Sequence, residues 1–159
     1  MAFPEGDLPP AAAAPIPAAA NKSLLFTPLK LRGLTLKNRV IKAAAFEAGC
    51  DQAGAPLPSL IEHHREVAAG GTALTTVAYG SVSADGRSFE SQLLVGPASA
   101  DGLTTLAKAV HAEGGAVALQ LTHAGSFSHP EHGGVKPPAI APSRIFNPAG
   151  FNFAKEMLV

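Results

Sequence analysis

Short apolar runs near the start of the chain predict a β-hairpin followed by a strand. Leucines alternate with polar residues on both sides of Arg32-Gly33, which is typical of two short strands that turn at the glycine. Residues 40–44 then predict a short apolar strand, and residues 50–58, rich in Gly and Pro, predict a loop.

Two later segments have the periodicity of amphipathic helices. The first is expected to begin at the capping box Ser59-Leu60-Ile61-Glu62 and to end at Gly70-Gly71. The second is expected to be capped by Asp101 and to end at Gly114-Gly115. The apolar faces consist of Leu57, Leu60, Ile61, His64, Val67 and Ala68 in the first helix and of Leu103, Leu106, Ala107 and Val110 in the second.

Two uncharged runs, residues 73–79 and 116–121, predict strands that are covered on both faces, because they are too short for helices and do not alternate strictly. With the strand at residues 40–44, the order is strand, helix, strand, helix, strand. This order predicts right-handed crossovers and a parallel sheet, so the fold class is α/β. Three parallel strands alone would leave two open edges, and we expect low stability from such a sheet.

The two ends of the chain lack this regularity. Residues 1–23 are rich in Ala and Pro, and prolines interrupt the alanines, which predicts a disordered leader rather than a secretory signal. From Ser126 onward Pro, Gly and His predict loops, with one short element expected in residues 151–159. We therefore expect one domain, residues 24–159.

Composition narrows the function classes. The 159 residues carry 12 basic and 12 acidic side chains, so the sequence offers no basic face to nucleic acid or to an anionic membrane. A single cysteine excludes an internal disulfide, and no apolar run is long enough to span a membrane. We expect a soluble cytoplasmic protein.

The chemistry is expected at one edge of the sheet, because ligands bind at the carboxyl ends of parallel strands. Three clusters follow the predicted strands: residues 43–46, 78–80 and 120–125. Small residues allow a planar ligand to approach the backbone, and the amide of Gln120 both donates and accepts hydrogen bonds. This pairing suits the ring edge of a flavin or a nucleobase.

Several motifs follow one another between residues 25 and 125. They are LFTPL (25–29), GLTLKNRV (33–40), GG (70–71), VSADGR (82–87), HAEGG (111–115) and QLTHAG (120–125). In order and spacing, these motifs resemble those of the old yellow enzyme family.

The resemblance implies the N-terminal part of a (β/α)8 TIM barrel with FMN at the carboxyl-end mouth. It also implies reduction by NADH or NADPH and reoxidation by an activated alkene such as an enone or an enal. By resemblance, the residues that contact FMN are Ala43, Ala44, Ala45 and Phe46 after the first strand, Tyr79 after the second and Gln120 at the end of the third.

The sequence departs from the family pattern at several positions. Ala44 and Phe46 stand where the family commonly has Pro and then Thr or Cys, so we expect an altered flavin potential. Tyr79 replaces a Gly or Ala, and Ser126 stands where an Arg often follows. The resemblance implies family members more than twice as long. Their substrate-binding His/His or His/Asn pair and their proton-donating Tyr lie beyond the third strand. Catalytic residues are therefore unassigned, and we expect no catalysis by this portion alone.

The histidines have less specific interpretations. His123 either faces the site or packs under the turn that follows it. His123, His129 and His132 could suggest a metal cluster, but no cysteine or paired carboxylate accompanies them, so we expect no metal. His63 and His64 point about 100° apart on a helix, so we expect one in the core and the other in solvent.

Three other side chains are expected to have structural roles. Cys50 has no adjacent cation or helix start and is expected to be unreactive rather than a redox thiol. Lys42 is expected to reach a strand end or a carboxylate, and Arg87 to anchor its loop.

Two functional hypotheses follow. The first is an FMN-dependent oxidoreductase of the ene-reductase type, to which this chain contributes the flavin-facing strands and whose partner is a small-molecule alkene. The second is a non-catalytic partial barrel that associates with a second copy or with a complementary barrel fragment. The first hypothesis expects coding sequence after Val159 with a His-x-x-His or His-x-x-Asn pair and five more strand-helix units, and the second expects none.

Overall fold

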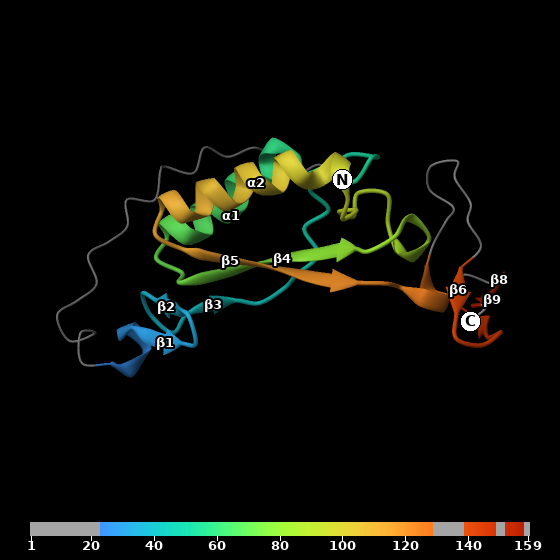
Figure 1. Ribbon diagram of the computed structural model, residues 1–159, viewed down its shortest axis with the longest axis horizontal. Helices are drawn as coiled ribbons and strands as arrows, with labels where there is room; N and C mark the ends of the chain where they lie inside the picture. Colours follow the sequence, from blue (N-terminus) through green and yellow to red (C-terminus); the bar gives the residue numbers. More distant parts are fainter. Residues whose placement is uncertain (1–22, 129–138, 149–151, 158–159) are drawn as a thin grey trace, which may run out of the picture.

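The centre of the molecule is a parallel three-stranded sheet covered by two helices on one face (Figure 1). The computed structural model describes residues 23–128, 139–148 and 152–157. The strands are β3 (Ile41–Lys42), β4 (Leu74–Ser81) and β5 (Ala116–Thr122), in the order β3-β4-β5. Helices α1 (Pro58–Ala69) and α2 (Pro97–Ala112) connect them, as the alternating pattern predicted. The predicted leader lies outside the described residues apart from Ser23.

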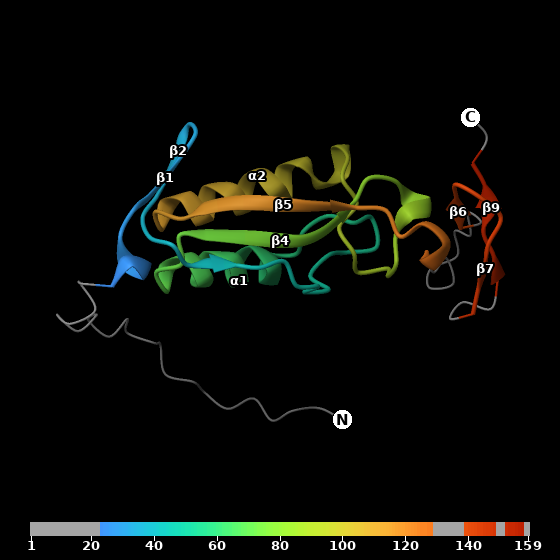
Figure 2. The ribbon, with the colours of Figure 1, turned by 90° about the horizontal axis from the view of Figure 1, so that it is seen from below.

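A β-hairpin precedes the sheet, at the end opposite to the one at which β4 and β5 finish (Figure 2). Strands β1 (Leu29–Leu31) and β2 (Leu34–Leu36) pair antiparallel. Gly33 turns the chain with φ 80°, a value that favours glycine because it has no Cβ. The predicted hairpin is confirmed.

Both helices begin earlier than the sequence patterns predicted. Helix α1 starts at Pro58, after Leu57, and no side chain caps it, so the predicted capping box at Ser59 is wrong. Helix α2 starts at Pro97, so Asp101 lies inside the helix and does not cap it. The physical reason is the same in both cases, because proline is well suited to the first helical position, where no N–H partner is required.

The core lies between the two helices and the sheet. It consists of Cys50, Leu60, Ala68, Val77, Leu93, Leu106 and Val110, with Ile61, Leu103, Val117 and Leu119 packed against them. His64 is fully buried, whereas His63 is exposed, which confirms that only one of the two faces the core.

One side chain joins the carboxyl ends of both helices. The ammonium of Lys37 donates hydrogen bonds to the carbonyl of Ala68 and to that of Glu113, each at 3.1 Å. Ala68 lies in the last turn of α1, and Glu113 directly follows α2. A cation at these ends interacts favourably with both helix dipoles.

The chain after β5 forms small elements rather than only loops. A 3-10 turn, η4 (Gly125–Phe127), is followed by β6 (Ile140–Ala141), which pairs parallel with β9 (Lys155–Glu156). Strand β7 (Phe146–Asn147) pairs antiparallel with β8 (Asn152–Phe153). Strands β8 and β9 confirm the expected short element, and β6 and β7 correct the prediction of loop structure.

Candidate cofactor site

The carboxyl ends of the three strands carry the predicted site residues in one row. Phe46 forms a parallel bridge with Ala78. Val77 pairs with Leu119, and the next pair is Gly80 with Leu121, so Ala78 and Tyr79 together oppose Gln120. This is a β-bulge, which bends the strand and redirects side chains. The structure therefore brings Phe46, Tyr79 and Gln120 side by side.

The amide of Gln120 faces away from the helices. Its neighbour Leu119 packs against the core under α2, and successive side chains of a strand point to opposite faces. Gln120 is exposed, and its amide has no hydrogen-bond partner among the described residues. Its donors and acceptor are available to a ligand.

Strand β3 is shorter than predicted, and Ala43, Ala44 and Ala45 follow it outside the ladder. Their methyl side chains leave the backbone open to close approach. The position of all three at the edge shared with Gln120 agrees with the parallel topology.

Three aromatic rings stand at this edge. The ring centroid of Phe46 lies 5.2 Å from that of Tyr79 and 4.9 Å from that of Phe89. Phe46 and Phe89 are stacked, and both are partly exposed. Phe89 comes from the long loop between β4 and α2, a contribution that sequence reasoning missed.

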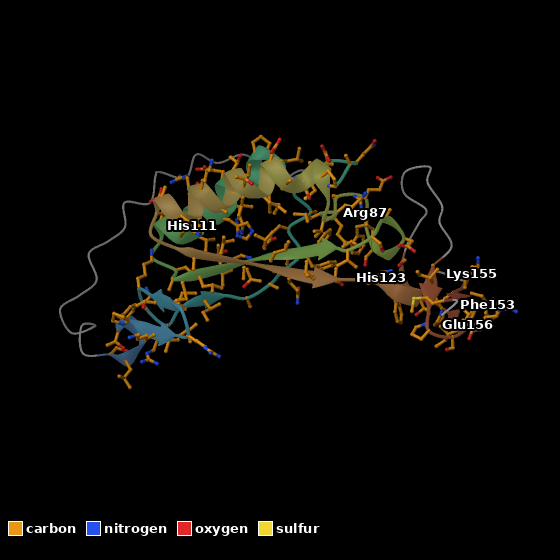
Figure 3. All side chains as sticks on the ribbon, in the orientation of Figure 1. Arg87, His111, His123, Phe153, Lys155 and Glu156 are labelled. Carbon is orange, nitrogen blue, oxygen red and sulfur yellow. The ribbon has the colours of Figure 1, made fainter. Side chains whose placement is uncertain are left out.

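That loop is fixed to the end of β4. The backbone of Ser81 donates to the carbonyl of Leu93 and accepts from Val95, both at 2.8 Å. Arg87 donates to the carbonyls of Gln52 and Glu90, so it anchors the loop as expected. Figure 3 shows Arg87 and His123 at the end of the sheet to which the β4 and β5 arrows point, and His111 at the other end.

His123 packs in the turn after β5. Its Nδ1 accepts a hydrogen bond from the backbone of Gly125 at 2.9 Å, and its Nε2 lies 3.8 Å from the carboxylate of Asp85. A Cβ at Gly86 would lie 2.5 Å from the imidazole, so any larger residue there would displace the His123 ring. The structure favours the turn-packing interpretation over a role in the site.

A polar cluster lies behind the row, on the helix side of the sheet. Lys42 makes an ion pair with Glu47, which confirms its predicted carboxylate partner. Nδ1 of His64 is 2.7 Å from the hydroxyl of Thr75, and its Nε2 is 3.7 Å from Glu47. Burial is the main cause that lowers the pKa of His64 to about 4. Sequence reasoning missed Glu47, although an acid in the otherwise apolar segment after β3 was a usable signal.

Cys50 lies in the core and not at the row. Burial, followed by the nearby charge of Asp51, raises the pKa of its thiol from 9.0 to about 11. This environment supports the interpretation of Cys50 as unreactive.

We therefore expect Cys50 to react slowly with a disulfide reagent such as DTNB at pH 8. The reactive thiolate is about a hundredfold rarer at the higher pKa. The rate in native buffer should be at least about tenfold lower than the rate in urea. Cys50 is the chain's single cysteine, so the signal is unambiguous. Equal rates in the two solvents would contradict this prediction.

Neither a metal centre nor a membrane span is found within the described ranges. No group of three or more His, Cys, Asp or Glu is placed there to hold a metal ion. His129 and His132 lie outside those ranges, so the suggested cluster with His123 is not tested. None of the described helices is both long and apolar enough to cross a bilayer.

The fold and the row of residues define the class of protein. The structure has parallel strands joined by helices, with small residues and the exposed amide of Gln120 at the carboxyl edge. These are the opening units of a ligand-binding (β/α) barrel. In the described residues the sheet is open, and the barrel is not closed.

Residues 24–157 match the NADH:flavin oxidoreductase / NADH oxidase family, and the chain belongs to this family. It is 42% identical over 131 residues to 4,4'-dithiodibutanoate disulfide reductase of Rhodococcus erythropolis. That match covers 82% of this chain and 32% of the relative. It is 32% identical to NADPH dehydrogenase of a Geobacillus species, covering 78% of this chain and 36% of the relative. The chain thus spans about a third of the length of these two relatives.

Solved structures agree on the fold. A 2-naphthoyl-CoA reductase complex matches with a TM-score of 0.79 and 28% identity, covering 85% of this chain and 22% of that one. An old yellow enzyme homologue from Zymomonas mobilis matches with a TM-score of 0.77 at 20% identity, covering 86% and 40%. These neighbours confirm the expected α/β fold as part of a TIM barrel.

The row of site residues, which consists of residues 43–46, Tyr79 and Gln120, fits FMN. FMN is the cofactor that the family implies together with NADH or NADPH. The pyrimidine edge of a flavin alternates acceptors with an N–H donor, and the free amide of Gln120 has both complementary groups. The methyl side chains of Ala43, Ala44 and Ala45 leave space for a planar ring beside the backbone. Phe46 and Tyr79 add an apolar border.

Proposed function

We propose that this chain supplies the flavin-facing part of an FMN-dependent oxidoreductase of the old yellow enzyme type. The proposed reductant is NADH or NADPH, and the proposed acceptor is an activated alkene such as an enone or an enal. The observation that carries the proposal is the row of Phe46, Tyr79 and the unpartnered Gln120 at the carboxyl edge. We also propose a cytoplasmic location.

Each residue of the row has a proposed role. Gln120 holds the pyrimidine part of the ring by a paired donor and acceptor, and Ala43, Ala44 and Ala45 contact the ring through their backbone. The rings of Phe46 and Tyr79 exclude water from the ring's edge. Bound there, FMN supplies hydride-transfer chemistry. Residues that bind the substrate oxygen or donate a proton remain unassigned.

The first test is the visible absorption spectrum of the purified chain after incubation with FMN and desalting. We expect a retained flavin band that approaches one equivalent. If the chain keeps native circular dichroism but releases all flavin, these strands do not form the cofactor site by themselves.

No catalysis is expected from this portion alone, so the acceptor class is tested on flavin-loaded protein complemented with a barrel fragment that supplies the remaining strands. NADPH and a panel of acceptors are then supplied. The panel should include a cyclic enone and 4,4'-dithiodibutanoate, the compound in the name of the 42% identical relative. Reduction of the enone supports the proposal. If only the disulfide is reduced, the acceptor class is a disulfide and not an activated alkene.

A second candidate is a partial-barrel module that associates with another chain. It is favoured by the exposed apolar side chains at the outer strands, such as Leu121 at 61% exposure and Ile41 at 51%. An open apolar groove also lies between α2 and β5. A mass measured by light scattering at twice the monomer value, without bound flavin, would favour this candidate.

A further inference from the structure

The carboxylate of Glu47 connects three elements just behind the candidate flavin site. One oxygen pairs with the ammonium of Lys42 on β3. The other oxygen accepts a hydrogen bond from the backbone N–H of Ala78 on β4 at 3.4 Å and lies 3.7 Å from Nε2 of His64 on α1. The Glu47 side chain is only 13% exposed.

The Ala78 contact falls where β4 loses its regular pairing. Ala78 and Tyr79 stand between the paired residues Val77 and Gly80 and have no register partner on β5. On the β3 side the pairing of Ala78 is an isolated bridge with Phe46 rather than part of a continuous ladder. At such a bulge, backbone groups need other partners, because an unpaired buried N–H is costly. Ala78 is 6% exposed, so water is a poor substitute, and Glu47 provides the acceptor.

An ion pair with Lys42 does not by itself explain this arrangement. A buried ion pair between Lys42 and Glu47 could form within β3 and the segment after it, without any contact to β4. Instead, the second oxygen of Glu47 is directed at the bulge and at the fully buried His64. Glu47 therefore links the helix, the first strand and the redirected part of the second.

We propose that Glu47 is a positioning residue that fixes the Ala78-Tyr79 bulge beside Gln120 and Phe46. The effect on cofactor binding rests on the proposed function, whereas the effect on the bulge does not. Glu47 acts from the helix side through the Ala78 backbone, so it is not a catalytic residue.

The test compares two double variants in the full chain. Lys42→Met with Glu47→Leu removes both charges and the acceptor, and Lys42→Met with Glu47→Gln removes both charges but keeps an acceptor oxygen. Removing both charges avoids leaving one buried charge without its partner, which would destabilise the fold whether or not Glu47 positions the bulge. Glu66→Leu, at an exposed position on α1, is the control for the loss of a carboxylate.

The primary measurement is hydrogen exchange at the Ala78 amide, which needs no cofactor. We expect exchange about tenfold faster in the Leu double variant, and rates near those of the wild type in the Gln double variant and the control. The second measurement is FMN binding, for which we expect about a tenfold rise in Kd in the Leu double variant alone.

The outcomes separate the two proposals. The positioning role is overturned if hydrogen exchange at Ala78 is unchanged in the Leu double variant. It is also overturned if exchange is accelerated equally in both double variants. If exchange changes as expected but the wild type itself binds no FMN, the positioning role stands and the proposed function fails.

Discussion

Replacing Gln120 by leucine is expected to weaken FMN binding by about 1 to 3 kcal/mol, a rise in Kd of roughly 5- to 150-fold. Leucine has a similar volume but cannot donate or accept a hydrogen bond. The polar edge of the ring would then lose its partner within a partly closed site. Isothermal titration of the apo protein with FMN measures this change.

The matched control is Gln52→Leu, which makes the same chemical change at an exposed loop position. The control should bind FMN as the wild type does. Folding is not at risk in the Gln120 variant, because the side chain is exposed and has no partner among the described residues. Unchanged affinity would remove Gln120 from the site.

Acidification is expected to lower the free energy of unfolding by up to about 3 kcal/mol through His64 alone. Its pKa is lowered from 6.5 to about 4, mainly by burial, with Glu47 raising it and Lys42 and His63 lowering it. Between pH 6.5 and 4 the unfolded chain binds a proton that the folded chain does not. Stability from this group is therefore fully present above pH 6.5 and falls as the pH drops toward 4.

Urea unfolding at several pH values measures the slope. His64→Gln should be less stable at pH 7, because it loses the contact with Thr75, but its stability should depend less on pH in this window. His63→Gln, at the exposed neighbouring position, should keep the wild-type slope. If the plots of unfolding free energy against pH run parallel for the wild type and His64→Gln, His64 is not the cause of the slope.

The order of strands and helices could be predicted from the sequence, whereas the helix starts could not. Glycine pairs after each helix and uncharged runs for each strand were sufficient for the α/β topology. The polar residues Ser59 and Asp101 suggested caps, but Pro58 and Pro97 begin the helices. Proline at the first helical position was the stronger signal, because its backbone already has the required φ angle.

The site could be predicted only as far as strand topology determines it. Parallel strands bring residues 43–46, 78–80 and 120–125 to one edge, and the structure has this arrangement. The bulge at Ala78-Tyr79, the stacking of Phe89 and the three contacts of Glu47 depend on side-chain packing between elements distant in sequence. No periodic pattern in the sequence records such contacts.

The Lys37 ammonium, which bonds to the ends of both helices, has a consequence for cooperativity. One ammonium donates hydrogen bonds to the ends of both helices. Detachment of either helix from the sheet therefore also weakens the last turn of the other helix. The two strand-helix units are thus expected to unfold as one unit rather than in succession. A charge-removing change such as acetylation of Lys37 would remove this link and leave the shared core alone to couple the two helices.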